Sequence, residues 1–167
     1  SGADLSGSDL SCSNLSGSNL SGSDLSGSNL FGSDLSGSKG IDSNRCTPLR
    51  ILFEQVGKIR AYKLVNEKNE GPFNGGIVYK IGESCEVSDA DTNETKQCAG
   101  GISLATLDWC MREWKDGYRI LIAEFEAKDI AVIPVATDGK FRVFRCVIVG
   151  EKNLIDIGLT RASQGAK

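Results

Sequence analysis

The sequence predicts a short β-solenoid of about two coils over residues 1–40, followed by a small α+β domain over residues 58–159. Two observations support this prediction: a strict five-residue leucine period in the first segment, and the composition of an ordinary globular core after it. Residues 1–40, called the repeat segment from here on, contain 14 Ser and 8 Gly. Residues 41–57 are predicted to be a linker or a capping helix, and residues 160–167 a tail.

The leucine period decides the backbone path of the repeat segment. Each leucine follows Asp or Asn, and a small residue precedes that pair. An α-helix would scatter leucines at this spacing around its axis, and a flat strand would send alternate ones to opposite faces. The chain must therefore turn a corner in every pentad, so that four pentads close a coil and coils stack. The predicted core is the column Leu5, Leu10, Leu15, Leu20, Leu25, Leu30 and Leu35.

The stretch ADLSGSDLSCSNLSGSNLSGSDLSGSNLFGSDLSG resembles the pentapeptide-repeat family over residues 3–37. The resemblance implies a right-handed quadrilateral β-helix with four pentads per coil. This sequence departs from the family pattern by placing Ser where Ala is usual at the inward positions, and those hydroxyls then need partners, for example in the next coil. On composition alone, the alternative is a disordered Gly/Ser linker.

A coil of 20 residues places Asp4 on Asp24 and Asn14 on Asp34, and points Phe31 outward. Asp4, Asp24, Phe31 and Asp34 are therefore the candidate interaction surface. Seven leucines are too small a core to order this segment alone. We expect further coils of a longer solenoid, the second domain or a second subunit to cover its ends.

Hydrophobic patterning predicts the elements that follow the repeat segment. Thr47 and Pro48 suggest a helix over residues 48–56 that caps the open end of the solenoid, although alternating apolar residues there also permit a strand. Ser103 is the expected N-cap of a helix running to residue 115. An Asp-Gly turn at residues 137–140 predicts a hairpin. The expected strands are 58–65, 76–81, 118–126, 130–135 and 141–149.

The stretches KIRAYKLVNEKNEGPFNGGIVYKIG, QCAGGISLATLDWC and AKDIAVIPVATDGKFRVFRCVIVG resemble a small uncharacterised domain fused to pentapeptide repeats in bacterial and viral proteins. The resemblance spans residues 58–150 and implies an accessory domain. It transfers no catalytic residue.

Six cysteines raise the question of metal binding, and their residue spacing argues against it. The nearest two are twelve apart, whereas zinc sites bring ligands in close pairs. We expect buried thiols at Cys110 and Cys146, with a Cys85–Cys98 disulfide as the first alternative and a metal site as the second. The chain has no His, which excludes Ser-His and Cys-His nucleophile pairs.

Three further features were considered as sites. The glycines of AGGIS, residues 99–103, could receive an anion ahead of the expected helix, or form a tight turn. The loop GPFNGG at residues 71–76 reads as a turn first and a binding loop second. Glu124 and Glu126 share a strand face, either as a close pair with one raised pKa or as solvated charges. No catalytic residue, cofactor site or metal site is predicted.

Charge and hydropathy narrow the function classes. The net charge is −3, and all of it lies in the repeat segment, so no basic surplus favours direct nucleic-acid binding. No apolar run could cross a bilayer, so we expect no membrane association, and no signal peptide opens the chain. We therefore expect a cytoplasmic or virion-associated protein.

The expected function is a non-enzymatic structural or protein-interaction module. A small domain caps a rigid solenoid, and the module associates with itself, as a homodimer or end-to-end polymer, or with a protein partner in a virion or filament. The alternative, implied by the family resemblance, is a DNA mimic that inhibits a topoisomerase or another DNA-binding protein.

Overall fold

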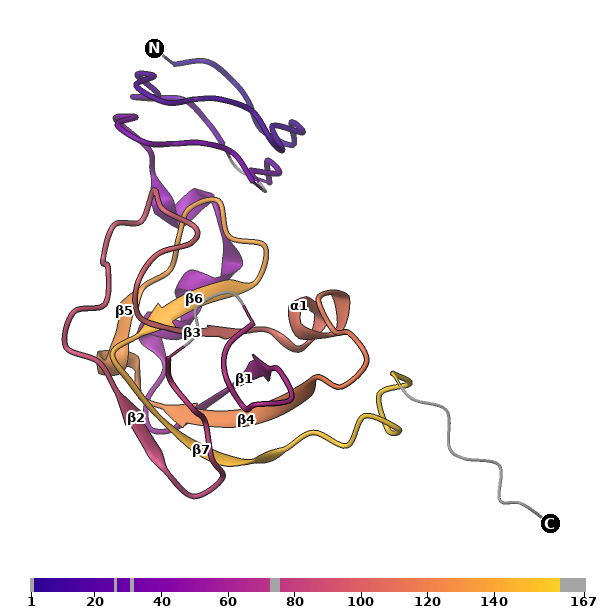
Figure 1. Ribbon diagram of the computed structural model, residues 1–167. Coiled ribbons are helices and arrows are strands. Elements are labelled where there is room, and N and C mark those ends of the chain that lie inside the picture. The colour runs from indigo at the N-terminus through magenta and orange to yellow at the C-terminus, as the bar shows by residue number, and fades with distance from the viewer. Residues whose placement is uncertain (1, 26, 31, 73–75, 160–167) are drawn as a thin grey trace.

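The computed structural model describes residues 2–25, 27–30, 32–72 and 76–159. Figure 1 shows the repeat segment stacked on one side of an open, seven-stranded sheet. Two 3₁₀ helices, Ser43–Arg45 and Pro48–Glu54, connect the two regions. The second one begins as the sequence predicts, because Thr47 accepts a hydrogen bond from the Leu49 N–H and Pro48 is its first residue. Within the described ranges, no helix combines the length and apolarity that a membrane crossing needs.

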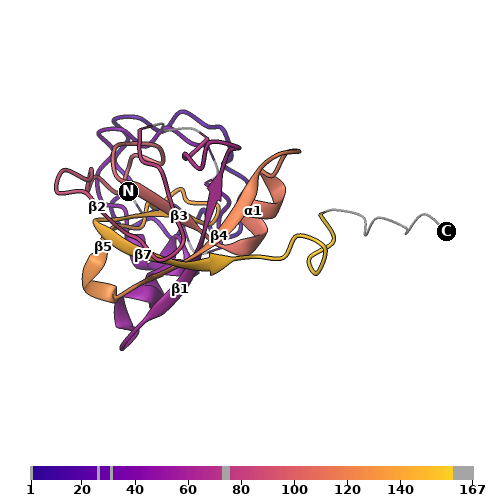
Figure 2. The same ribbon diagram turned by 60° about the horizontal axis from the view of Figure 1, so that its bottom comes forward.

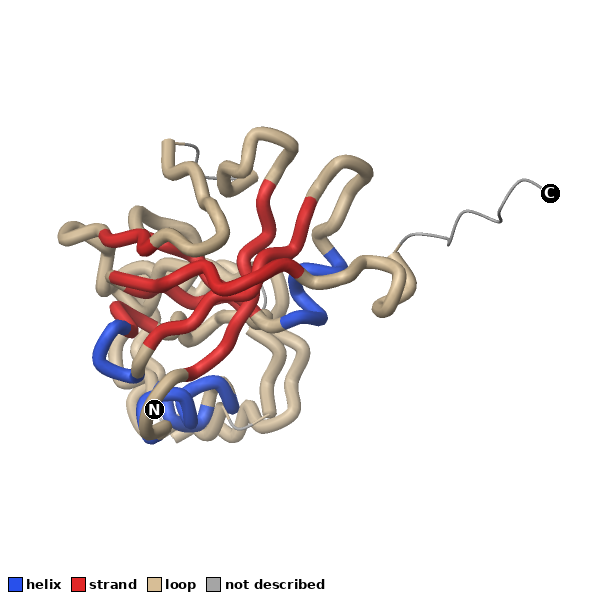
Figure 3. The backbone as a smooth tube through the Cα atoms, turned by 90° about the horizontal axis from the view of Figure 1, so that it is seen from below, coloured by secondary structure: helices blue, strands red, loops and turns tan. Residues whose placement is uncertain are grey.

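All neighbouring strands of the sheet are antiparallel, and its order is β2-β7-β4-β1-β3-β6-β5. Figure 3 shows the strands crossing the middle of this domain and the helices at its margin. The strands are β1 (Ile59–Val65), β2 (Ser84–Glu86), β3 (Ile102–Ala105), β4 (Arg119–Phe125), β5 (Ile130–Val132), β6 (Lys140–Val143) and β7 (Arg145–Glu151). One α-helix, α1 (Leu107–Arg112), and a third 3₁₀ helix, Ala127–Asp129, complete the described elements.

Apolar side chains on the two faces of the sheet form separate cores. The larger one includes Phe125 and Phe141, whose ring centroids lie 5.5 Å apart. The other packs Trp109 and Cys110 of α1 against Ile120 of β4. Figure 2 shows α1 beside the sheet and the chain leaving this domain toward the C-terminus. Residues 160–167, predicted as a tail, lie outside the described residues.

The strand predictions for the central pair were confirmed, 130–135 contains the shorter strand β5, and two other predictions differ from the structure. Residues 58–65 and 118–126 contain β1 and β4, the central pair. Residues 76–81 form no strand within their described part; Val78 makes only an isolated bridge to Glu70. The predicted single strand 141–149 breaks at Phe144 into β6 and β7, which pair with different neighbours in the sheet.

The helix predicted with Ser103 as its N-cap begins three residues later, after Thr106, and ends at Arg112 instead of residue 115. Residues 102–105 form β3, because Ile102 and Leu104 pair with β6 and are completely buried in the sheet core. Tertiary burial thus overrides the helical spacing of the apolar residues. The residue before α1 is Thr106, and its side chain makes no capping hydrogen bond.

The 3₁₀ helix Pro48–Glu54 does not itself cover the leucine column. Its Leu49 and Leu52 pack against the core of the sheet. Ile41 and Cys46, which precede it, pack against the column instead, together with Val135 and Ala136 from the loop between β5 and β6. Strand β5 ends early, at Val132, and this loop then reaches the coils.

A buried arginine on β6 organises the long loop that precedes β3. Arg142 is 1% exposed, and its guanidinium donates to the carbonyl oxygens of Asp91, Asn93 and Lys96 at 2.8–2.9 Å. These backbone acceptors satisfy a charge that would otherwise be costly to bury. The loop 88–95 is therefore held in place through its backbone carbonyls.

Candidate functional site

The corners of the coils are built from the Asp and Asn residues that precede each leucine. The carboxylate of Asp4 accepts hydrogen bonds from the backbone N–H of Ser6 at 3.0 Å and from its hydroxyl at 2.6 Å. Asn14 makes the same pair of bonds with Ser16. These side chains imitate a backbone turn, which is why the repeat alternates Asp and Asn but admits little else. Serines two positions later donate these hydrogen bonds, and they are structural residues that the sequence reasoning missed: Ser6, Ser11, Ser16, Ser21 and Ser36.

Stacking between coils follows a 20-residue register. Parallel bridges join Asp4 to Asp24, Asp9 to Asn29, Asn14 to Asp34 and Asn19 to Lys39. On the first face, the Leu5 N–H donates to the Asp24 carbonyl at 2.8 Å, and the Asp24 N–H donates to the Ala3 carbonyl at 3.0 Å. These are the four pairs that a 20-residue coil predicts.

The inward serines find partners mostly in the pentad just before their own. Ser28 and Ser38 donate to the carbonyl oxygens three residues earlier, at 2.7 and 2.6 Å. Ser33 instead donates to the Leu10 carbonyl of the preceding coil at 2.7 Å. Serine at these positions thus adds hydrogen bonds along the column, which Ala could not do.

The sheet domain covers the leucine column at one end, and the leucines at the other end are only partly buried. Leu20, Leu25, Leu30 and Leu35 are buried, and Leu35 is 0% exposed, because Val135 and Ala136 cover the second coil. Leu5, Leu10 and Leu15 of the first coil are only partly buried. The first coil also lies farther from the sheet, as Figure 1 shows.

The open end also presents backbone groups. On the first face, the hydrogen bonds between the coils are made by the N–H of Leu5 and the carbonyl of Ala3. The backbone N–H and C=O of Asp4 take no part in them. Because successive residues of an extended strand point their N–H and C=O groups to opposite edges, those of Asp4 face away from the second coil. The open end is defined here as Leu5, Leu10 and Leu15 with the outward backbone of Asp4, Asp9 and Asn14.

The comparison with known families decides the nature of this segment. The family model for pentapeptide repeats matches residues 1–37, in 8 copies. Residues 1–37 are pentapeptide repeats. The resemblance predicted over residues 3–37 is therefore confirmed. No curated protein and no solved structure matches the chain, so the likeness of residues 58–150 to an accessory domain stays a prediction.

The pentapeptide coils carry few aligned charges. Only Asp4 and Asp24 stack as two carboxylates, whereas every other bridged pair places an acid beside an amide, or Asn19 beside Lys39. Hydrogen bonds from Ser6 hold the pKa of Asp4 below its usual value, although the Asp24 carboxylate opposes this. Bonds from Ser36 lower the pKa of Asp34 in the same way. These acids are ionised at neutral pH. Phe31, the fourth predicted surface residue, lies outside the described residues.

Of the two alternatives for Glu124 and Glu126, the close carboxylate pair is not favoured by the structure. Glu124 lies on β4 and binds Lys58 at 3.2 Å and Arg60 at 2.9 Å, whereas Glu126 lies beyond the strand and binds Lys128 at 2.6 Å. These hydrogen bonds lower the pKa of both carboxyls. The sharing of a proton that general acid catalysis needs is therefore not favoured here.

The glycine-rich stretch at residues 99–103 has no helix behind it. It leads into β3, and the Gly100 carbonyl accepts a hydrogen bond from the Asp91 N–H at 3.0 Å. The anion-binding interpretation is wrong, because it needed the free N–H groups of a helix start. Residues 71–76 lie partly outside the described residues.

Three cysteines belong to the interior of the sheet domain. Cys85, Cys110 and Cys146 are buried and free, as predicted for the last two, and burial raises the pKa of Cys110 to about 12. Cys85 lies opposite Cys146 in the register of β2 and β7, whereas Cys98 is bonded to Lys140, so the Cys85–Cys98 disulfide is wrong. In the part of the chain that the structure describes, no three His, Cys, Asp or Glu side chains gather as a metal site would need.

Proposed function

We propose that the chain is a non-enzymatic structural and protein-interaction module. In this proposal the pentapeptide repeats form a right-handed quadrilateral β-helix, and the sheet domain caps one end of it. The other end mediates self-association as a homodimer in a cytoplasmic or virion-associated assembly, since one available end per chain does not allow an end-to-end polymer. The observation that carries the proposal is the asymmetry of the leucine column, which is buried under Val135 and Ala136 at one end and only partly buried at Leu5, Leu10 and Leu15.

The open end has two properties that favour association. Its half-buried leucines offer apolar area, which contributes on the order of 25 cal/mol per Å² when water is excluded. Its outward backbone groups offer hydrogen bonds to a second strand, and unprotected strand edges are templates for pairing. A second copy satisfies both, because it presents the same leucines and the same backbone edge. The partner in a two-fold dimer would meet this end with its own.

The experiment is multi-angle light scattering over a concentration series, with a charge placed at the open end. We expect a concentration-dependent dimer for the unchanged chain and its loss in Leu5→Lys. Val149→Lys is the matched control, because Val149 is 38% exposed on β7 of the sheet domain. A monomer at every concentration, or an oligomer that Leu5→Lys leaves intact, would overturn self-association through this end.

The alternative, a DNA mimic, has one supporting observation, which is the stacked pair Asp4 and Asp24. Duplex DNA carries about one negative charge per 1.7 Å of its axis. The charge density of the coils is far lower, because only one of their four faces stacks two carboxylates. The alternative predicts topoisomerase inhibition that weakens with added salt and in Asp4→Asn combined with Asp24→Asn. Inhibition with that pattern would favour it over the first proposal.

A further inference from the structure

A small pocket lies where β1, β3 and α1 meet. Residues 62–64 of β1 and 103–105 of β3 form two of its walls, and Trp109 of α1 forms a third. Lys140 and Cys98 complete the lining, and the cavity measures about 40 Å³. Since one water molecule needs about 10–15 Å³ on this measure, the space suits a ligand of about three heavy atoms.

A buried amine lies in the wall of this pocket. Lys63 is 7% exposed; its Nζ donates to the Ser103 carbonyl at 2.9 Å and lies 4.6 Å from the centre of the Tyr79 ring. Among the described residues that line the pocket there is no carboxylate to favour the charged form. Burial lowers the pKa of Lys63 to about 8. About a tenth of this amine is therefore uncharged and nucleophilic at pH 7, and about half of it at pH 8.

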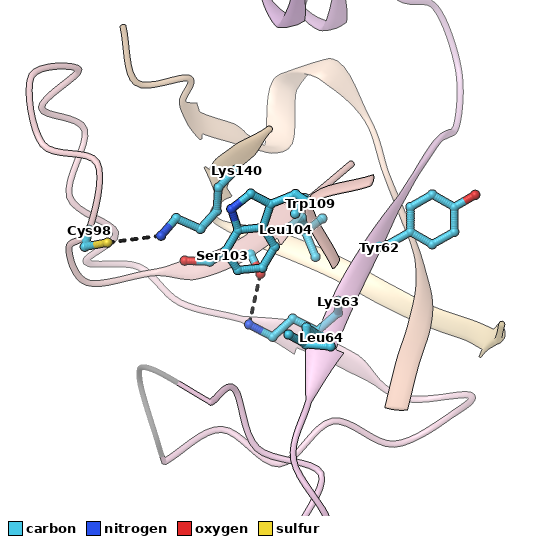
Figure 4. A pocket seen from close by; sticks show the side chains of 9 residues that line it. Tyr62, Lys63, Leu64, Cys98, Ser103, Leu104, Trp109 and Lys140 are labelled. Atoms are coloured by element: carbon cyan, nitrogen blue, oxygen red, sulfur yellow. Dashed lines mark hydrogen bonds between the residues drawn. The ribbon is translucent and has the colours of Figure 1, made fainter. Parts of the chain in front are cut away.

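A second amine approaches the pocket from β6. The Lys140 Nζ lies 3.0 Å from the Cys98 Sγ and 5.3 Å from the centre of the Trp109 ring. Figure 4 shows the two amines on different sides of the Trp109 indole, with Lys140 reaching toward Cys98 and Lys63 toward Ser103. Lys140 is partly exposed and Cys98 is exposed, so the pocket meets solvent on this side.

We propose that the pocket binds carbon dioxide and that Lys63 carries it as a carbamate. The lone pair of the uncharged Nζ forms a bond to the carbon of CO₂, and one C=O bonding pair moves onto oxygen. The nitrogen then loses one proton to solvent water beside Cys98. The products are the Lys63 carbamate anion and one proton, with no change of oxidation state and no other reactant.

The charges of the pocket favour this electrophile over an aldehyde. A carbamate is an anion, and the Lys140 ammonium is the charged group in the lining that can stabilise it. The remaining N–H of the carbamate can keep the bond to the Ser103 carbonyl. An aldehyde would give a protonated imine, which places a buried positive charge near Lys140 with no carboxylate in the lining to balance it.

The test is ¹³C-labelled CO₂ with the intact chain at pH 8, followed by alkylation of the carbamate and peptide mass spectrometry. The exposed lysines Lys58, Lys80 and Lys128 are internal controls, since their side chains are 61–75% exposed. A pKa near 8 gives an uncharged fraction about 100-fold above that of an ordinary lysine. We expect label on Lys63 to exceed label on each control by about 10- to 100-fold.

Substitutions of Lys140 distinguish carbamate formation at Lys63 from the general reactivity of a buried amine. Lys140→Met should lower the label on Lys63 several-fold, and Lys140→Arg should restore most of it. The label should also fall below pH 8 as Lys63 is protonated. The other groups acting on Lys63 are Tyr79 through its ring, Cys85 on β2, Cys110 on α1, Cys146 on β7 and Lys140 on β6.

Two outcomes would overturn the proposal. One is equal labelling of Lys63 and the exposed lysines in the unchanged chain, which needs no variant and no assumption about folding. The other is absence of carbamate together with selective capture of Lys63 by a small aldehyde and a hydride reductant, which would assign imine chemistry to the pocket instead.

Discussion

The repeat segment and the sheet domain solve the same problem, satisfying a buried backbone, in opposite ways. Each coil finds its hydrogen-bond partners 20 residues away, in a register that repeats on four faces. In the sheet, β1 pairs with β4, about 60 residues later, and β6 and β7 are consecutive in the chain yet lie far apart in the sheet. In the repeat segment, a local sequence pattern is enough to determine which residues pair, because every unit repeats it. In the sheet domain, the residues around a strand do not determine which strand it pairs with.

The regions also differ in where their polar groups go. In the coils, Asp and Asn side chains stay at the surface and form turns with nearby serines. In the sheet domain, Arg142 and Lys63 are buried and donate to backbone carbonyls of distant segments. Surface turns tolerate change, but an unpaired buried acceptor costs about 1–3 kcal/mol. The largest mutational effects should therefore lie in the sheet domain.

Among the substitutions that test this comparison, Arg142→Leu should cause the largest loss of stability. It leaves the carbonyls of Asp91, Asn93 and Lys96 without their donor, and we expect the free energy of unfolding to fall by about 3–5 kcal/mol. Urea denaturation measures the loss, and hydrogen exchange should locate it in residues 88–97 and the sheet. Arg145→Leu is the control, because Arg145 is an exposed arginine on β7 and its loss should stay within about 0.5 kcal/mol. Equal losses in the two variants would contradict the assigned role of Arg142.

The sequence also predicted the repeat segment better than the sheet domain. The leucine column and the stacking of Asp4 on Asp24 follow from a period of five, because a repeat constrains every unit by its neighbours. Strands β1 and β4 were also predictable, since both are long and apolar. The helix expected at Ser103 was not, because pairing with β6 converts its first residues to strand.

The candidate sites of the sheet domain were likewise hard to predict from the sequence. The burial of Lys63 arises only when β3, α1 and β6 close around β1. Val135 and Ala136 likewise gain their capping role from the loop that carries them to the coils. One signal could have suggested Lys63, namely a lysine inside the apolar run Ala61–Val65, since Lys within a buried strand needs a reason.

A smaller effect should separate the two ends of the leucine column. Leu25 is 1% exposed in the second coil, so Leu25→Ala should cost about 3 kcal/mol of unfolding free energy. Leu5 stacks below it in the open first coil and is only partly buried, so Leu5→Ala should cost about 1 kcal/mol. Denaturant titration of the two variants is a matched test, because residue type and face are the same. Equal costs would mean that the first coil is covered in solution, which would itself support association through the open end.

The smallest effect should appear only in acid. Hydrogen bonds from Ser11 and Ser36 lower the pKa of Asp9 and Asp34 in the folded coils. Their stabilisation is therefore fully present above the unfolded pKa, near pH 4, and is lost as pH falls through the lower folded value. Asp9→Asn combined with Asp34→Asn keeps the turn, as Asn14 and Asn19 do, but removes the titration.

The melting temperature of the unchanged chain should consequently fall more steeply below pH 4 than that of this double variant, while the two should agree at pH 7. Circular dichroism across this range measures the difference. Asp116→Asn is the control, since this exposed carboxylate follows α1 and lies outside the coils. Should the control flatten the acid limb as much as the double variant, the coil carboxylates would act through net charge alone. Serine hydrogen bonds at the corners would then not be what makes the repeat segment sensitive to acid.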